Sequence, residues 1–171
     1  MKYYFEQISD ISIIVNIFKI KLPSLSLALK YPPFGVRVKN GPDSTTIFDF
    51  IRKKWVSITD EEWVRQHVLM YLVKDKKYPA SLIAVEKEIK LNDLKKRFDI
   101  VVFNKQMKPE IIIECKAPYV ELDKSVIEQV QRYNLTIKAK YVMITNGVSD
   151  LILDKNNNAV ELPDYSNHNI I

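Results

Sequence analysis

The sequence predicts an α/β protein with a mixed central sheet flanked by helices. The expected elements run helix, three strands, helix and strand, an order typical of a sheet with helices packed against it. The strand-like runs at 100–103 and 111–113 are apolar at successive residues, so both faces of these strands should be covered. A chain of 171 residues can bury roughly two-thirds of the surface of its unfolded form. We therefore expect one domain in which these two runs are central strands.

The chain before the first helix divides into two parts. Residues 1–30 show poor alternation and precede a Pro-Pro pair, so we interpret them as a separable N-terminal leader ahead of a single domain over 31–171. Residues 34–50 hold two strand-like runs around an Asn-Gly-Pro-Asp turn, which is typical of a hairpin. The domain should therefore open with a small antiparallel unit.

The strongest helix signal lies at 60–74. Thr59 is a good N-cap, three acidic residues follow it, and Val64, Val68 and Leu72 recur at a spacing of four. Strands are then expected at 81–91, 97–104 and 110–116. Residues 123–140 predict a second helix, capped by Asp123 or Ser125, and 141–147 a further strand that stops at a glycine. This order supports the mixed sheet.

Charge and composition narrow the function classes. The net charge is +5, and basic residues cluster at 52–54, 74–77, 95–97 and 138–140. Such clusters suit a polyanion, although solvated surface lysines would look the same. The single cysteine suits a reducing compartment such as the cytoplasm, and no apolar run reaches membrane-spanning length. Two histidines and three glycines give little support for a zinc site or a phosphate-cradling loop.

Three polar residues interrupt the two central strands. Glu114 and Lys116 are two apart and should share a face, while Cys115 points to the other face. A four-residue loop over 105–108 would place Asp99 directly opposite Glu114. Two such carboxylates repel each other, so Lys116 and a divalent cation such as Mg²⁺ would be needed between them. This pattern predicts a phosphodiester-hydrolysis site, and the alternative is a buried Asp-Lys-Glu ion cluster.

The motifs "RFDIVVF", "IIIECKAP" and "EQVQRY" resemble the Asp, Glu-x-Lys and Gln-x-x-x-Tyr pattern of PD-(D/E)XK nucleases. With "EEWVRQ" before them, they are similar to the N-terminal nuclease domain of type I restriction enzyme R subunits in a stand-alone form. The resemblance covers about 31–163 and implies a restriction-endonuclease-like fold. The proline of the family's name is replaced by Phe98.

The resemblance also implies roles for individual residues. Asp99 and Glu114 would hold Mg²⁺, for which Mn²⁺ would substitute, together with the backbone carbonyl of Cys115, and Lys116 would be the catalytic lysine. Gln129 and Tyr133 would face the same site from the second helix. They could equally belong to a helix that only packs against the sheet, although a glutamine on an apolar stripe requires a polar partner for its hydrogen bonds.

Further candidates remain open. The family places a glutamate on the first helix: Glu62 completes a capping box with Thr59, whereas Glu61 shares the apolar stripe. Arg97 and Arg65 are candidate contacts to DNA, and a solvated strand-end arginine is the alternative for Arg97. We expect a DNA endonuclease domain that could work with separate helicase or specificity subunits. The alternative is a DNA- or partner-binding module with the same fold and little activity.

Overall fold

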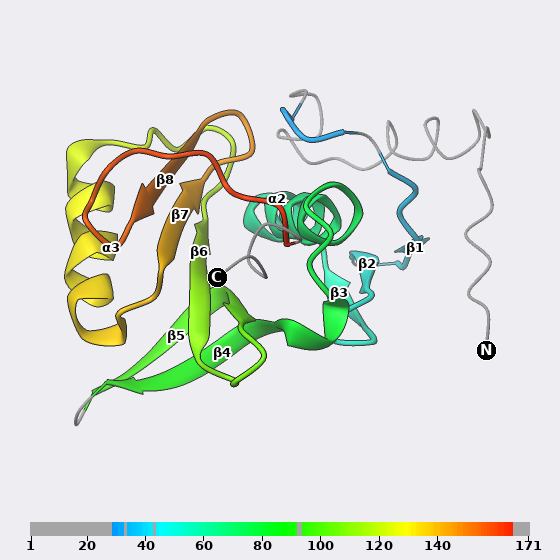
Figure 1. The fold of residues 1–171 in the computed structure, drawn as a ribbon. Helices are drawn as coiled ribbons and strands as arrows, with labels where there is room; N and C mark the ends of the chain where they lie inside the picture. The colour runs from blue at the N-terminus through cyan, green and yellow to red at the C-terminus, as the bar shows by residue number, and fades with distance from the viewer. Residues whose placement is uncertain (1–28, 33, 43, 92–93, 166–171) are drawn as a thin grey trace.

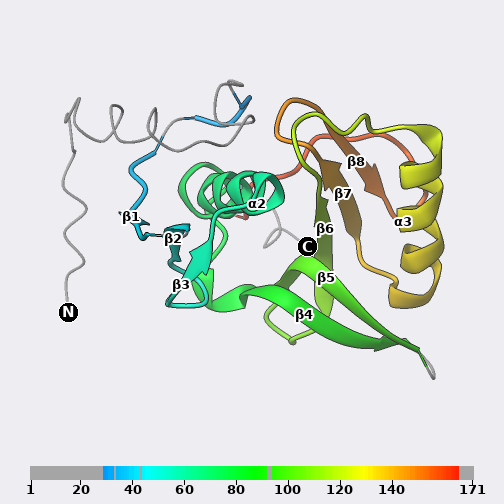
Figure 2. The same ribbon diagram turned by 180° about the vertical axis from the view of Figure 1, so that it is seen from behind.

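The computed structural model describes residues 29–32, 34–42, 44–91 and 94–165. Within them, a five-stranded mixed sheet has the order β4-β5-β6-β7-β8, and a separate three-stranded antiparallel sheet has the order β1-β2-β3 (Figure 1). Helix α2 lies between the two sheets, and both views show it there (Figures 1 and 2). The predicted mixed sheet with flanking helices is confirmed. The strands are β1 (Val38–Asn40), β2 (Thr45–Asp49), β3 (Lys54–Ser57), β4 (Ile83–Leu91), β5 (Leu94–Phe103), β6 (Pro109–Cys115), β7 (Tyr141–Thr145) and β8 (Asp150–Asp154).

The small sheet contains the predicted hairpin and one strand that the sequence analysis missed. Strands β1 and β2 pair antiparallel, as the Asn-Gly-Pro-Asp turn predicts. Strand β3 then returns along β2 and pairs Trp55 with Phe48. The inner face of this sheet packs on Trp63 of α2 through Ile47, and Ile58, which follows β3, belongs to the same cluster.

Helix α2 (Asp60–Met70) begins where the sequence predicts. The Glu62 amide donates to the Thr59 hydroxyl at 3.0 Å, which confirms Thr59 as the N-cap. The helix continues as one π-helical turn over Tyr71–Asp75, so the helical stretch reaches the predicted end near residue 74. Val64, Val68 and Leu72 are fully buried against the five-stranded sheet.

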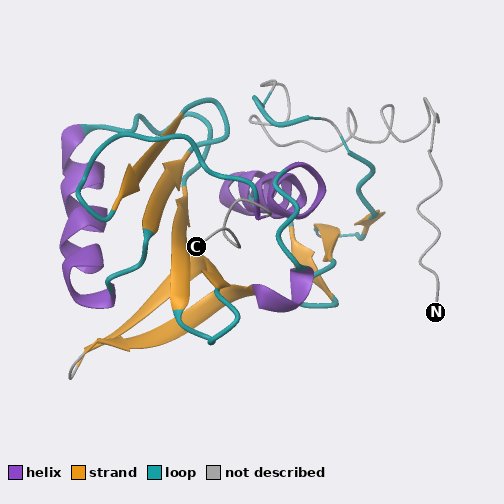
Figure 3. Cartoon of the chain, viewed as in Figure 1, coloured by secondary structure: helices purple, strands orange, loops and turns teal. Residues whose placement is uncertain are grey.

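Strands β5 and β6 are flanked by sheet neighbours on both sides, and residues 100–102 and 111–113 are almost completely buried. This confirms them as central strands. Helix α3 (Lys124–Ile137) then connects β6 to β7, and these two strands pair in parallel (Figure 3). Asp123 caps α3, because its carboxylate accepts from the Val126 amide at 3.0 Å.

The chain just before the predicted domain boundary contacts the five-stranded sheet. The Lys30 amide donates to the Gly147 carbonyl at 2.8 Å, and its ammonium pairs with Asp150 at 2.8 Å. Leu29 packs so closely on Gly147 that a Cβ at position 147 would lie 2.7 Å from a Leu29 methyl group. The rest of the predicted leader, 1–28, lies outside the described residues. No described helix is long and apolar enough to cross a membrane.

Candidate functional site

Glu114 and Lys116 form an ion pair where β6 ends. The Lys116 ammonium donates to a Glu114 carboxylate oxygen at 3.1 Å, and the two side chains are 23% and 19% exposed. Burial, and next the charge of Asp99, raise the pKa of Glu114. Burial alone would lower the pKa of Lys116, but the charge and hydrogen bond of Glu114, together with the charges of Glu61 and Asp99, outweigh burial and raise this pKa. Lys116 is therefore a partly desolvated cation beside a carboxylate whose ionised form is destabilised by burial and by the charge of Asp99.

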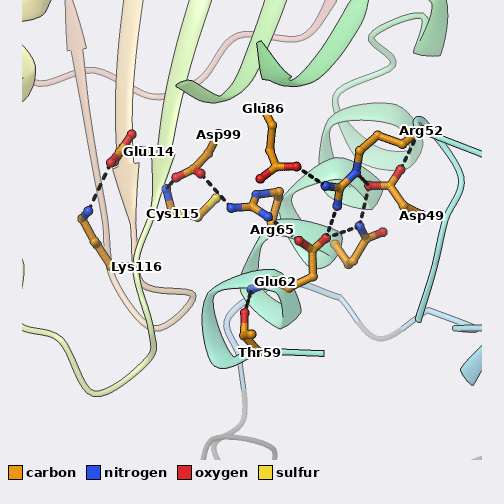
Figure 4. A network of polar contacts seen from close by, with 11 residues as sticks. Asp49, Arg52, Thr59, Glu62, Arg65, Glu86, Asp99, Glu114, Cys115 and Lys116 are labelled. Atoms are coloured by element: carbon orange, nitrogen blue, oxygen red, sulfur yellow. Dashed lines mark hydrogen bonds and ion pairs between the residues drawn. The ribbon is translucent and has the colours of Figure 1, made fainter. Parts of the chain in front are cut away.

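Asp99 lies beside the same stretch of β6 but is engaged by other groups. Its Oδ1 accepts from Arg65 Nη2 at 2.7 Å, and its Oδ2 accepts from the Cys115 amide at 2.8 Å. Figure 4 shows Asp99 on the α2 side of β6, whereas Glu114 and Lys116 extend from the other side. The expected meeting of all three side chains in one pocket is therefore not seen in this arrangement.

The register explains what the sequence analysis placed well and what it did not. Ile100 pairs with Ile113, which would set Asp99 opposite Glu114 as predicted, although a bulge at Val102 makes the loop one residue longer than expected. The side-chain alternation then breaks at Asp99. Ile100 packs with the α2-side core, but Phe98, two residues earlier, packs with Val101 on the opposite face.

The partner strand is irregular at the same place. Pairing between β4 and β5 runs from Val85↔Ile100 to Lys87↔Phe98 in one register and omits Glu86 and Asp99, which lie between these pairs. Glu86 has a φ of +51°, in the left-handed region, which is not strand geometry. The turn of Asp99 toward α2 therefore coincides with a local loss of regular strand geometry.

A chain of ion pairs extends from Asp99 across α2 to the small sheet (Figure 4). Arg65 also bonds Glu62, and Glu62 bonds Arg52. Arg52 donates to Asp49 and to Glu86, both at 2.6 Å. Gln66 adds bonds to Asp49 and Glu62.

This network carries more negative than positive charge. It joins the carboxylates of Asp49, Glu62, Glu86 and Asp99 to the guanidiniums of Arg52 and Arg65, so two negative charges are formally in excess. Asp49 is fully buried and Glu62 and Arg65 nearly so. Burial alone would lower the pKa of Arg65, but Asp99 and Glu62 outweigh it and raise this pKa. A further cation near Asp99 would reduce the excess charge.

The two first-helix glutamates lie in different environments. Glu62 is buried, and its carboxylate bonds Arg52 and Arg65 in place of closing the capping box. Glu61 is exposed, and its charge helps raise the pKa of Lys116. It also lines an open groove of about 430 Å³ whose other lining residues are Ile58, Thr59, Asp60, Ala117, Tyr119 and Val120. Glu62 is thus linked to Asp99 through Arg65, whereas Glu61 lies near Lys116.

The remaining candidates are placed as follows. Gln129 and Tyr133 lie on α3, but their side chains are outside the described part of the chain. Arg97 is exposed on β5 opposite Glu88. Arg65, expected to contact DNA, is buried and bonded to carboxylates. The Cys115 side chain packs in the core, as expected, with its amide on Asp99.

Arg52, Asp49 and Glu86 form part of the ion network but were not singled out from the sequence. Arg52 was read as one of a cluster of surface basic residues. One signal was available, because Asp49 stands three residues before Arg52 where an apolar strand ends. Glu86 carries no such local signal.

The fold and this cluster define an α/β protein with carboxylates and a lysine gathered at the end of a central strand. Residues 60–165 match the family described as type I restriction enzyme R protein N terminus (HSDR_N). The match covers more than half of the chain, and the chain belongs to this family. The resemblance to this family noted from its motifs is thereby confirmed.

The chain also shows a weak similarity to a solved structure. It is a protein from Anabaena variabilis ATCC 29413, described as "a putative nuclease belonging to DUF820". The two chains are 12% identical with a TM-score of 0.39, over 76% of this chain and 88% of that one. No curated protein matches the chain.

Proposed function

We propose that this chain is a metal-dependent endonuclease domain that hydrolyses phosphodiester bonds of DNA. The observation that carries the proposal is the Glu114–Lys116 pair beside Asp99, at the end of a central strand, in a member of the R protein N-terminal family. We further propose that the domain acts in the cytoplasm with Mg²⁺, that Mn²⁺ substitutes, and that helicase or specificity subunits are its partners.

The donor chemistry suits a divalent cation. Asp99 and Glu114 flank the Cys115 peptide from its two sides, and Mg²⁺ prefers carboxylate and carbonyl oxygens. Within the described residues, no three His, Cys, Asp or Glu side chains are already arranged around a common point for a metal. Arg65 holds one oxygen of Asp99, so a cation at this carboxylate would compete with the guanidinium. Asp99, Glu114 and the Cys115 carbonyl would be its ligands only after Asp99 left Arg65 and turned toward the Glu114 side of β6.

The protein groups divide the remaining work. Lys116, charged and partly desolvated, can stabilise negative charge that develops on a phosphate during hydrolysis. Glu114 holds the ammonium in place through its 3.1 Å bond. A bound divalent cation would polarise the phosphate and acidify a water molecule. Glu61 lies near enough to Lys116 for its negative charge to help raise the pKa of the lysine.

The direct test is cleavage of supercoiled plasmid in Mg²⁺ or Mn²⁺ by the parent chain and by Lys116→Ala. Loss of an electrostatic stabiliser of this kind costs on the order of 10²-fold in rate. Lys105→Ala, which removes an exposed lysine from the β5–β6 turn, is the matched control and should cleave like the parent. Equal cleavage by the parent and Lys116→Ala would refute the catalytic role of Lys116.

A binding module without activity is the second candidate. The occupied state of Asp99 favours it, because Arg65 and the Cys115 amide already satisfy both carboxylate oxygens. This candidate predicts DNA or partner binding with no nicking by any variant. An unchanged melting temperature in millimolar Mn²⁺ would support it, since a ligand that binds only the native state raises stability.

A further inference from the structure

The outer face of the three-stranded sheet combines two cations with two aromatic rings. The Arg37 guanidinium lies 4.5 Å from the ring centre of Phe48 and 5.6 Å from that of Trp55. The Lys39 ammonium lies 4.2 Å from the ring centre of Trp55. The two rings pack edge to face, with their centres 5.4 Å apart. We call these four residues the basic sheet face.

Strand alternation directs this face away from the candidate catalytic site. Val38 and Ile47 pack inward toward α2. The neighbouring positions Lys39 and Phe48 therefore project outward. Because α2 separates the small sheet from the five-stranded sheet, the basic sheet face and the Glu114–Lys116 pair lie on different sides of the molecule (Figures 1 and 2).

The charge of this region has one sign. The exposed charged side chains described between residues 34 and 59 are all basic, namely Arg37, Lys39, Lys53 and Lys54. No described carboxylate forms an ion pair with any of the four, and Asp49 is fully buried in the ion network. Asp43 lies outside the described residues. Four cations without a partner carboxylate among the described residues favour a polyanionic ligand.

The apolar content argues against a protein partner for the same surface. Arginine and aromatic residues are enriched at protein interfaces, but the core of such an interface is apolar and depleted of charge. The exposed large apolar side chains of the described residues are Met107, Tyr119 and Val148, and none belongs to this sheet. Phe48 and Trp55 are half-buried beneath the cations of Arg37 and Lys39. The rings hold these cations in place and leave the N–H donors of Arg37 and Lys39 directed outward.

We propose that the basic sheet face, flanked by Lys53 and Lys54, binds the phosphate backbone of duplex DNA at a place separate from the catalytic site. The proposal shares its ligand class with the proposed function. It does not require that the domain cleave DNA.

The test is fluorescence anisotropy of a labelled duplex with the full chain in EDTA, where cleavage cannot occur. Arg37→Ala/Lys39→Ala should weaken binding to unrelated sequences alike. Each lost phosphate contact reduces the slope of log affinity against log salt by about 1, so we expect a slope lower by about 2. Lys105→Ala/Lys155→Ala removes the same charge from two exposed turns and should keep the parent slope.

A charge-preserving variant separates charge from packing. Arg37→Lys/Lys39→Arg should bind like the parent, and circular dichroism checks that every variant is folded. The proposal is overturned if the alanine pair keeps the parent's affinity and slope, if the parent does not bind duplex at low salt, or if only an acidic polypeptide binds this face. Plasmid nicking by Lys116→Ala is measured separately, so a failure of the nuclease proposal leaves this result readable.

Discussion

The carboxylates on the two sides of β6 are stabilised by different sets of partners. On the α2 side, Asp99 has both oxygens occupied and joins a network of four carboxylates and two guanidiniums. On the α3 side, Glu114 has Lys116 as its described partner, and its pKa is raised. Asp99 is held in place by several hydrogen bonds, whereas the ionised form of Glu114 is destabilised by burial and by the charge of Asp99. Glu114 and Lys116 should therefore respond most to a bound phosphate or cation, whereas Asp99 should also support the fold.

Arg65→Met tests the fixed side and should have the largest effect. Removing one partner of a buried ion pair costs about 3–5 kcal/mol in the free energy of unfolding. Calorimetric titration should nevertheless show tighter Mn²⁺ binding to the folded fraction, because the guanidinium no longer competes for Asp99. General damage to the fold cannot raise metal affinity, so weaker binding would argue against metal at Asp99.

Asp99→Asn asks whether the fixed carboxylate takes part in chemistry. The change keeps the shape and removes a ligand charge, so plasmid cleavage should fall by about 10²-fold while DNA affinity holds or rises as repulsion of phosphate eases. Filter binding and nicking assays on the same preparation give both quantities. A collapse of affinity with unchanged cleavage per bound complex would make Asp99 purely structural.

The two first-helix glutamates provide a paired comparison. Glu62→Gln weakens bonds to the half-buried Arg52 and the buried Arg65 and should cost about 1.5–3 kcal/mol in urea unfolding. Glu61→Gln, at an exposed neighbouring position, should change stability by less than about 0.5 kcal/mol. If Glu61→Gln alone slows cleavage, Glu61 is the site glutamate. The reverse result assigns the role to Glu62.

The smallest effect concerns pH. The pKa of Glu114 is raised in the folded chain, so the native state keeps this proton to a higher pH than the unfolded chain does. Its ionisation therefore lowers stability as pH rises from the ordinary glutamate range through the raised value. A cation favours the ionised form, so added Mn²⁺ should raise the melting temperature more at pH 7.5 than at pH 5. Glu114→Gln should abolish this difference.

Local patterns predicted most of the fold. The spacing of Val64, Val68 and Leu72 predicted α2, and apolar runs predicted β5 and β6, because these signals depend on residues close in sequence. The ion network could not be found this way. Arg52 and Glu86 are 34 residues apart, and only the tertiary fold brings them together.

The site was predicted in part for the same reason. Sharing of a face by Glu114 and Lys116 follows from the period of a single strand, and their ion pair is present. The direction of Asp99 instead departs from regular alternation, where Asp99 and Glu86 of the neighbouring strand are both omitted from the strand pairing. A regular-strand argument has no means of locating such a break.

Arg52 has a consequence for how the molecule unfolds. Its guanidinium contacts carboxylates from the end of β2, from α2 and from β4. Separation of either sheet from the helix would leave acidic groups of the interior without their counter-ion. We therefore expect the small sheet not to unfold by itself at low cost, and the two sheets to unfold together.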